Sequence, residues 1–168
     1  MSARQTHRFV MKFCPSHMLP STRGTLLSER YNDPAGPMRL LSRLLSHTRE
    51  RTVCAVDLAG SELFRDASGN VPAWVALEYM AQCVAAHGVL LDGLDVPKPG
   101  LLVGAKRLAL HVDGFAPDES LEVSAVILQR VGRLASLECE LRSAGELVAE
   151  GTLSVFIPDG LLKPGATA

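Results

Sequence analysis

The chain has 168 residues, which is enough for one domain of ordinary size and too few for two. Hydrophobic residues make up 47% of it and charged residues 21%, a composition that argues for a packed core and against wholesale disorder. The formal net charge is -1. Proteins that bind nucleic acid by neutralising phosphates are usually clearly basic, so we expect no nucleic-acid partner.

The first 33 residues read as a basic extension of the domain. Within residues 1–30, Glu29 is the only acidic residue, against Arg4, Arg8, Lys12, Arg23 and Arg30. An apolar stretch at residues 9–11 is broken by Lys12 and is too short for a secretory signal. We expect residues 1–33 to be a disordered extension, or to follow from an upstream start codon, rather than to be a targeting signal. Residues 34–158 should form the domain, and residues 159–168 a flexible tail.

Four cysteines are spread along the chain with no Cys-x-x-Cys pair and no metal-ligand spacing to the five histidines. They are Cys14, Cys54, Cys83 and Cys139. A domain of this size needs no disulfide framework to hold its core. We therefore expect reduced thiols in a cytoplasmic protein, with no metal and no other cofactor.

The elements predicted along the chain are one long helix among strands. Residues 51–58 alternate loosely and favour a strand, and residues 66–70 are a loop by composition. The next stretch is almost continuously apolar, and Pro72 suits the first turn of a helix over residues 71–91. Four further strands are expected at residues 101–112, 121–131, 134–143 and 147–157, with hairpin turns at residues 131–133 and 143–146.

The third of these later strands indicates how the sheet is buried. Ala135, Leu137, Cys139 and Leu141 alternate with polar residues, which is typical of a strand with one buried face and one wet face. A buried helix followed by antiparallel strands predicts an α+β domain in which the sheet wraps the helix.

The predicted helix contains three polar residues in an otherwise apolar sequence. Glu78 and Gln82 are four residues apart and so share one helix face. Burial should raise the pKa of Glu78 and prepare it to act as a general acid, unless it pairs with an arginine or turns to solvent at a dimer edge. His87 lies half a turn out of phase with Glu78, and we expect it to be a hydrogen-bonded core histidine. The three polar groups also disfavour a membrane span.

Residues 72–82 read Pro-Ala-Trp-Val-Ala-Leu-Glu-Tyr-Met-Ala-Gln. This run resembles the Pro-Gly-Val-x-x-x-Glu-x-Met-Ala-Gln run of the hotdog-fold (3R)-hydroxyacyl-ACP dehydratases of fatty-acid synthesis. Residues 36–44 resemble the first strand of that family, and residues 104–110 and 150–155 resemble its later strands. The form found here looks most like the dehydratase-like proteins of bacterial aryl-polyene gene clusters. The resemblance implies a hotdog fold, in which an antiparallel β-sheet wraps a long central helix.

The resemblance also implies roles for site residues. In the family, a histidine fourteen residues before the helix glutamate removes a proton from C2 of the 3-hydroxyacyl thioester, and the glutamic acid protonates the departing hydroxyl. Glu78 matches the acid, and Gln82 would support it. The start of the helix, with Pro72, Ala73 and Trp74, would polarise the thioester carbonyl through backbone N–H groups. The expected histidine position holds Phe64, which cannot accept a proton.

The missing histidine leaves several functions open. Because the family builds each site across a dimer interface, a heterodimer with a histidine-bearing homologue would assemble one complete site around Glu78. Such a dehydratase subunit would convert a 3-hydroxyacyl thioester on an acyl carrier protein to the trans-2-enoyl thioester. A homodimer would need another base, such as Asp57 or Asp66. The alternatives are a non-catalytic hotdog partner or acyl-carrier-binding subunit and, third, a hotdog thioesterase. Pro34 also stands where the family often has a histidine.

Overall fold

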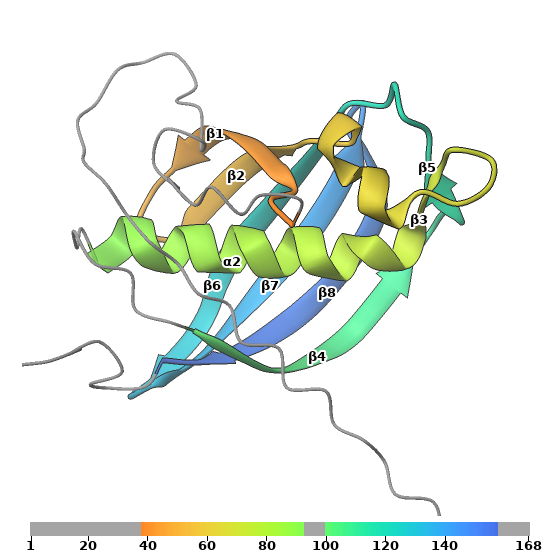
Figure 1. The fold of residues 1–168 in the computed structure, drawn as a ribbon. Helices are drawn as coiled ribbons and strands as arrows, with labels where there is room; N and C mark the ends of the chain where they lie inside the picture. Colours follow the sequence, from red (N-terminus) through yellow and green to blue (C-terminus); the bar gives the residue numbers. More distant parts are fainter. Residues whose placement is uncertain (1–37, 93–99, 158–168) are drawn as a thin grey trace, which may run out of the picture.

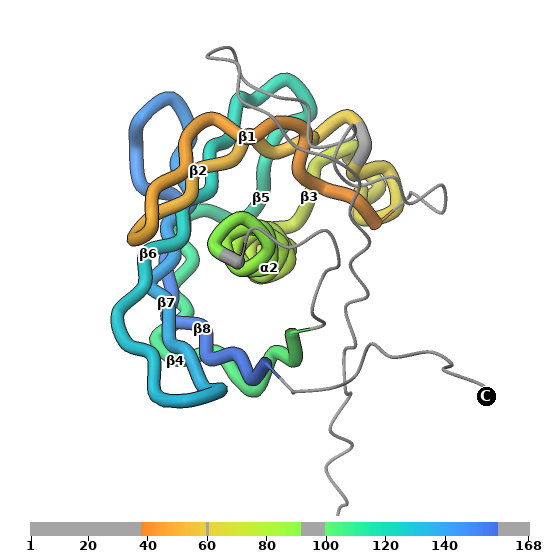
Figure 2. Tube along the Cα trace, turned by 90° about the vertical axis from the view of Figure 1, so that its left-hand side faces the viewer, coloured from red at the N-terminus to blue at the C-terminus, as the bar shows by residue number. Residues whose placement is uncertain are grey.

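The computed structural model describes residues 38–92 and 100–157, and in it an antiparallel six-stranded sheet curves around one helix, α2 (Ala76–Asp92). Figure 1 shows α2 lying across the strands, and Figure 2 shows the sheet passing around it from one edge strand to the other. The predicted α+β fold class is therefore confirmed. In spatial order the strands are β1 (Leu41–His47), β2 (Arg51–Val56), β6 (Leu121–Val131), β7 (Leu134–Ser143), β8 (Glu146–Phe156) and β4 (Leu101–Leu110).

The core lies between α2 and the concave face of the sheet. Tyr79, Met80 and Cys83 of the helix are fully buried. The four apolar residues of the alternating pattern in β7 are buried too, while Glu138 between them is exposed. Each fully buried aliphatic or aromatic side chain contributes about 1.5–3 kcal/mol relative to an exposed one. The apolar residues of this alternating pattern thus stabilise the packing of β7 against the helix.

Both predicted hairpin turns are present. Gly132, between β6 and β7, has a φ of 58°. The turn between β7 and β8 has two central residues with positive φ, Ala144 at 48° and Gly145 at 89°. Two-residue hairpins favour this conformation because its twist matches that of the flanking strands. Glycine adopts it without a steric cost, whereas Ala144 does not.

The helix begins later than the sequence predicts. Residues 71–91 were expected to be helical throughout, but β3 (Val71–Pro72) pairs with β5 (Gly114–Phe115), and one turn of 3₁₀ helix, η2 (Ala73–Val75), precedes α2. The two short strands approach closely because Gly114 has no side chain. A Cβ there would lie 3.0 Å from the carbonyl oxygen of Val71. This pairing anchors the start of the helix to the segment after β4.

A second 3₁₀ helix, η1 (Ala59–Phe64), was not predicted and joins β2 to the loop at residues 66–70. In that loop Asp66 Oδ1 accepts hydrogen bonds from the N–H groups of Ser68 (2.8 Å) and Asn70 (3.1 Å), which hold the turn. The expectations for residues 1–33, Pro34, Cys14 and residues 159–168 lie outside the described residues. The domain boundaries therefore stay predictions.

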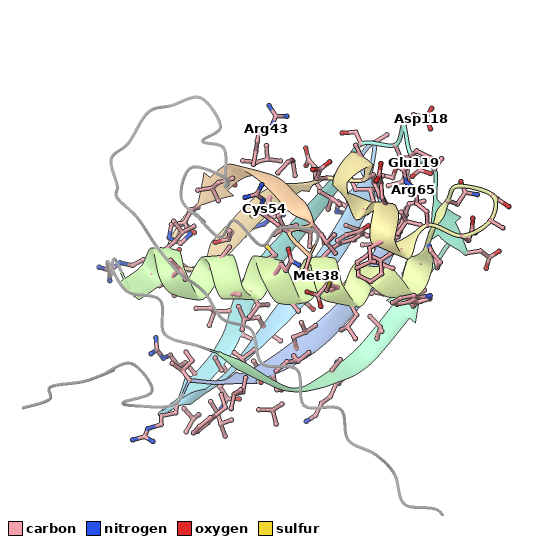
Figure 3. All side chains as sticks on the ribbon, in the orientation of Figure 1. Met38, Arg43, Cys54, Arg65, Asp118 and Glu119 are labelled. Atoms are coloured by element: carbon pink, nitrogen blue, oxygen red, sulfur yellow. The ribbon has the colours of Figure 1, made fainter. Side chains whose placement is uncertain are left out.

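Three thiols belong to the core. Cys54 of β2, Cys83 of α2 and Cys139 of β7 are free and fully buried, and Figure 3 shows Cys54 between its strand and the helix. Burial raises the pKa of Cys139 to about 12, and the hydrogen bond with Cys54, together with burial, raises that of Cys83. These thiols act as small apolar side chains that fill the space between α2 and the sheet.

One helical stretch of the described chain, Ala73–Leu91, is long and apolar enough to cross a membrane by length and composition. Half of that stretch is buried inside the fold, against β1, β2, β6, β7 and β8. The same length and composition are found in core helices that no bilayer surrounds. Its apolar character is accounted for by packing in the core.

Candidate active site

Glu78 lies in the first turn of α2 and is half-buried. Its immediate neighbours on the helix, Leu77 and Tyr79, are apolar or fully buried. Burial raises the pKa of Glu78 above its ordinary value of 4.5, and a hydrogen bond from Gln82 opposes part of that rise. The carboxyl group therefore keeps its proton to a higher pH than an exposed glutamate does.

Gln82 connects Glu78 to the segment that leads into β1. Its Nε2 donates to Glu78 Oε1 (2.9 Å) and to the carbonyl oxygen of Met38 (2.6 Å), while its Oε1 accepts from the N–H of Leu40 (3.0 Å). Figure 3 shows Met38 over α2. The two backbone partners fix the amide orientation, because the N–H of Leu40 only donates and the carbonyl of Met38 only accepts. Glu78 Oε1 is thus an acceptor, so that a proton on this carboxyl group would lie on Oε2.

Phe64 and Trp74 are in direct contact. Phe64 ends η1 and Trp74 lies in η2, and their rings meet edge to face with centroids 5.9 Å apart at 81°. Trp74 is 59% exposed and precedes Glu78 by four residues, about one helical turn. The position that resembles the family's histidine is therefore an aromatic contact beside the start of the helix.

The start of the helix offers fewer backbone donors than the sequence suggested. Pro72 has no N–H, and the N–H of Ala73 donates to the carbonyl oxygen of Asp113 (3.0 Å). Among Pro72, Ala73 and Trp74, Trp74 is therefore the residue that has a backbone N–H not bonded to Asp113.

The two alternative bases lie on either side of η1. Asp66 is exposed and uses its Oδ1 in the loop described above. Asp57 is half-buried, and its backbone carbonyl accepts from Ser61 Oγ (2.8 Å), which also contacts the hydroxyl of Tyr79 (3.3 Å). Within the described ranges, no hydrogen bond or ion pair joins either carboxyl group to Glu78.

His87 belongs to a separate polar cluster near the other end of α2. Its Nδ1 lies 2.7 Å from Thr52 Oγ1, which lies 2.8 Å from His47 Nδ1. His87 is 2% exposed, and burial, with a smaller effect of His47, lowers its pKa to about 4. Its Nε2 has no hydrogen-bond partner among the described residues. The expected role as a bonded core histidine thus holds for one of its two ring nitrogens.

Sequence reasoning missed the backbone of Met38 and Leu40, which Gln82 holds across 44 and 42 residues. It also missed the Phe64–Trp74 contact. No local pattern signals either of them, because both depend on how distant segments meet. In the part of the chain that the structure describes, no group of three His, Cys, Asp or Glu side chains is arranged to hold a metal ion.

Known structures share this fold. The dehydratase heterocomplex ApeI:P from Xenorhabdus doucetiae matches with a TM-score of 0.66 and 22% identity, over 73% of this chain and 85% of the other. A hypothetical thioesterase mutant from Streptococcus pneumoniae TIGR4 matches with a TM-score of 0.55 and 14% identity, over 68% and 88%. Thioesterase superfamily member 2 from Mus musculus matches with a TM-score of 0.52 and 17% identity, over 68% and 80%. At these identities the matches establish the hotdog fold.

No curated protein sequence matches the chain significantly. A family model does. The model of the ApeP-like family, described as ApeP dehydratase, matches residues 29–164 and so covers most of the chain, including the helix with Glu78 and every strand of the sheet. This match confirms the resemblance to the hotdog dehydratases and gives hydro-lyase as the reaction class. The chain belongs to the ApeP-like dehydratase family.

Proposed function

We propose that this chain is the acid-bearing subunit of a 3-hydroxyacyl-ACP dehydratase and works with a histidine-bearing hotdog partner. The observation that carries the proposal is the state of Glu78. Burial raises its pKa, and one of its two oxygens is held by Gln82. A carboxylic acid that is positioned and protonated can donate to a leaving hydroxyl group, which a carboxylate cannot do.

In the proposed reaction, a base on the partner removes a proton from C2 of the 3-hydroxyacyl thioester. Those electrons form the C2–C3 double bond as the C3–O bond breaks, and Glu78 gives its Oε2 proton to the departing oxygen, so that water leaves. The trans-2-enoyl thioester remains, with Glu78 ionised and the base protonated. Return of the proton to Glu78 completes the cycle. We assign the N–H of Trp74 to the thioester carbonyl, where charge develops as C2 loses its proton.

The edge strand β4 supports the proposed partner. It is ten residues long, and no described strand pairs with its outer side. Val103 is 62% exposed along it, and Leu108 and Leu110 are exposed as well. A strand edge of this length, apolar apart from the exposed Lys106 and Arg107, invites pairing with another chain. At the opposite edge, β1 is shorter, with seven residues, and Arg43 points away from the domain in Figure 3. We therefore assign the subunit contact to β4.

The identity of the partner is supported by two observations. Phe64 leaves this chain without the base that the family resemblance requires. The similar structure from Xenorhabdus doucetiae is a dehydratase heterocomplex. A heterodimer is therefore proposed in preference to a homodimer. The substrate is proposed to arrive on an acyl carrier protein, in the cytoplasm.

Two other functions are weighed against this one. A non-catalytic hotdog subunit is favoured by Phe64, but such a subunit has no need of a half-buried carboxyl group tied to Gln82. A thioesterase is favoured by similar folds among the thioesterases. The family model that matches residues 29–164 is that of a dehydratase, which favours dehydration over thioester hydrolysis.

The test is to supply the missing base. Phe64→His should give the lone chain dehydratase activity on a 3-hydroxyacyl-ACP, since both groups would then be present in a homodimer. Adding Glu78→Gln to Phe64→His should abolish that activity. Phe64→Tyr is the matched control, because it places a polar aromatic ring at the same position without a base of suitable pKa.

The unmodified chain should in addition activate a histidine-bearing partner, and that activity should require Glu78. A partner that is equally active with Glu78→Gln would move the chain to the non-catalytic class. Release of free acid and thiol in place of the enoyl product would identify a thioesterase.

A further inference from the structure

We propose that Lys106 and Arg107, near the middle of the edge strand β4, determine which subunit pairs with that strand. The two cations weaken pairing with a second copy of this chain and favour a hotdog partner whose own edge strand carries acidic side chains. The inference rests on the proposed function, because it gives a chemistry to the partner assigned to β4. It concerns how the complex assembles, so its test needs no catalytic turnover.

The first observation is the composition of the edge. Lys106 and Arg107 are exposed, and they are the only charged residues of β4. The other eight residues of the strand are apolar or glycine. Lysine on an unpaired strand edge opposes pairing with unwanted chains, because the pairing would bury or crowd its charge. The strand therefore offers an apolar edge with a cationic middle.

The second observation is that neither charge is neutralised within the described residues. No ion pair joins Lys106 or Arg107 to an acidic group in residues 38–92 and 100–157. Across the pairing of β4 with β8, the nearest acidic residue is Glu150, opposite Ala109, and its carboxyl group lies 3.5 Å from His111 Nε2. The two cations are thus available to a chain that pairs with β4.

The third observation is the symmetry of a homodimer. Two copies of β4 related by a two-fold axis would pair antiparallel, with the same residues on both sides of the contact. Lys106 lies opposite Thr152, which alternates with buried residues of β8, so Lys106 is on the face of the sheet turned away from α2. Cross-strand neighbours share a face. Pairings that align nearly all of β4 therefore place Lys106 opposite Gly104 or opposite Lys106 of the second copy.

In either register the two lysines become neighbours. Residues directly opposite have their Cβ atoms about 4.5–5.5 Å apart, and diagonal neighbours are about 7–8 Å apart. Both distances are within the Debye length of about 8 Å at physiological salt, so the repulsion is only partly screened. Arg107 doubles the number of like charges at this point. Acidic side chains at the corresponding positions of a partner would replace the repulsion by attraction.

The chain itself supplies the first test. Lys106→Glu/Arg107→Asp reverses the charge of the edge, and Asp suits the backbone at residue 107, whose φ of 54° few residues other than glycine adopt. Sedimentation equilibrium of the wild type, of this variant and of their equimolar mixture measures dimer formation. We expect the mixture to dimerise about tenfold or more tightly than either protein alone, with an advantage that shrinks as salt is raised.

Two further variants show where the effect lies. Lys106→Gln/Arg107→Asn removes the cations without adding acids, so it should self-associate more tightly than the wild type at low salt. The matched control is Arg43→Glu/Arg49→Glu, which changes the charge by the same amount at the β1 edge, where both arginines are exposed. A mixture of this control with the wild type should dimerise no more tightly than the wild type does.

The complex with the histidine-bearing partner provides the second test. Lys106→Glu/Arg107→Asp should raise its dissociation constant about tenfold or more. Lysines in place of the acidic residues on the partner's edge strand should restore the affinity for this variant. The repulsion weakens the homodimer without preventing it. The Phe64→His chain should therefore be active at concentrations that populate its homodimer, and adding Lys106→Gln/Arg107→Asn should lower the concentration required.

The inference is overturned if the mixture dimerises no more tightly than the separate proteins, or if the Arg43→Glu/Arg49→Glu control shows the same gain. It is also overturned if reversing the edge charge leaves the complex intact and raises KM for carrier-bound substrates but not for pantetheine substrates. The two cations would then bind the carrier protein.

The two proposals fail in different ways. A complex that dehydrates its substrate and is indifferent to the charges on β4 refutes this inference alone. A complex whose assembly depends on those charges, but which dehydrates no 3-hydroxyacyl substrate, refutes the proposed function and supports this inference.

Discussion

Glu78 and His87 lie nine residues apart on α2, and burial drives both toward the neutral form, by raising the pKa of the acid and lowering that of the base. Their surroundings differ. Glu78 is half-buried, and Gln82 donates a hydrogen bond to its Oε1 and not to its Oε2. His87 is sealed at 2% exposure against Thr52. In the proposed function the same desolvation serves a proton donor at Glu78, which remains accessible, whereas at His87 it accompanies a fixed core contact.

The largest effect is expected from Glu78→Gln. The amide keeps the shape of the side chain but transfers no proton, so the dehydration rate of the complex should fall by about 10²- to 10⁴-fold. The wild-type rate should fall as pH rises through the raised pKa, because the donor is then lost, whereas the residual rate of the variant should lack that limb. Measuring kcat against pH for both proteins checks this. Glu138→Gln, on the exposed face of β7, is the control and should behave as the wild type.

The same substitution also tests the sign of the shift at Glu78. A group whose folded pKa lies above the unfolded value of 4.5 contributes stability that is complete below pH 4.5 and is lost as pH rises through the folded pKa. The stability of Glu78→Gln relative to the wild type should therefore increase with pH in urea titrations. A difference that does not change with pH would mean that burial does not perturb the carboxyl group.

The second effect is a loss of stability in acid that His87 causes. Its pKa falls from 6.5 to about 4 in the folded protein. Because the folded pKa of His87 lies below the unfolded value, its contribution to the free energy of unfolding is complete above pH 6.5. That contribution is lost as pH falls toward 4. The shift corresponds to about 3 kcal/mol over that range. Urea titrations between pH 7 and pH 4 should show the loss, and His87→Gln should flatten this part of the curve. An equally steep curve in the variant would assign the effect to other groups.

The third effect comes from Gln82→Leu. It leaves the N–H of the buried Leu40 without an acceptor, which costs about 1–3 kcal/mol, whereas the exposed carbonyl of Met38 can bond to water instead. Because the bond from Gln82 lowers the pKa of Glu78, its removal should move the alkaline limb of kcat to higher pH. Gln82→Glu replaces the donor with a carboxyl group and serves as the comparison. A limb that stays in place would show that the amide supports only the fold.

The smallest effect is expected from Asp66→Asn, which keeps Oδ1 as an acceptor for Ser68 and Asn70. Stability should change by no more than about 0.5 kcal/mol, as at most surface sites. The dehydration rate should be unchanged, since a loop acceptor is not the base. A rate loss comparable to that of Glu78→Gln would instead identify Asp66 as the catalytic base.

Much of the fold follows from local patterns in the sequence. The alternation around Leu137 and the glycines at 132 and 145 act on neighbouring residues, and so the strands and turns they predict are present. The predicted start of the helix was wrong because Pro72 suits both the first turn of a helix and a short strand. The strand forms here because Gly114, which is distant in sequence, allows the two segments to pair closely.

The candidate site divides in the same way. The spacing of Glu78 and Gln82 predicted a contact on one helix face, and the 2.9 Å bond confirms it. The further hydrogen bonds of Gln82 to the backbone of residues 38 and 40 form because the segment before β1 packs beside α2. No local sequence pattern predicts that long-range contact. The role of each residue in dehydration stays a prediction.

The rate at which the three core thiols react with a reagent would measure how often the domain opens. Thiolates react with disulfide reagents, and the raised pKa values of Cys83 and Cys139 keep those groups as thiols in the folded protein. In a Cys14→Ser background, labelling by an aromatic disulfide therefore requires that α2 lift from the sheet. The labelling rate, followed with and without the partner subunit, would report how far assembly slows that excursion in the native state.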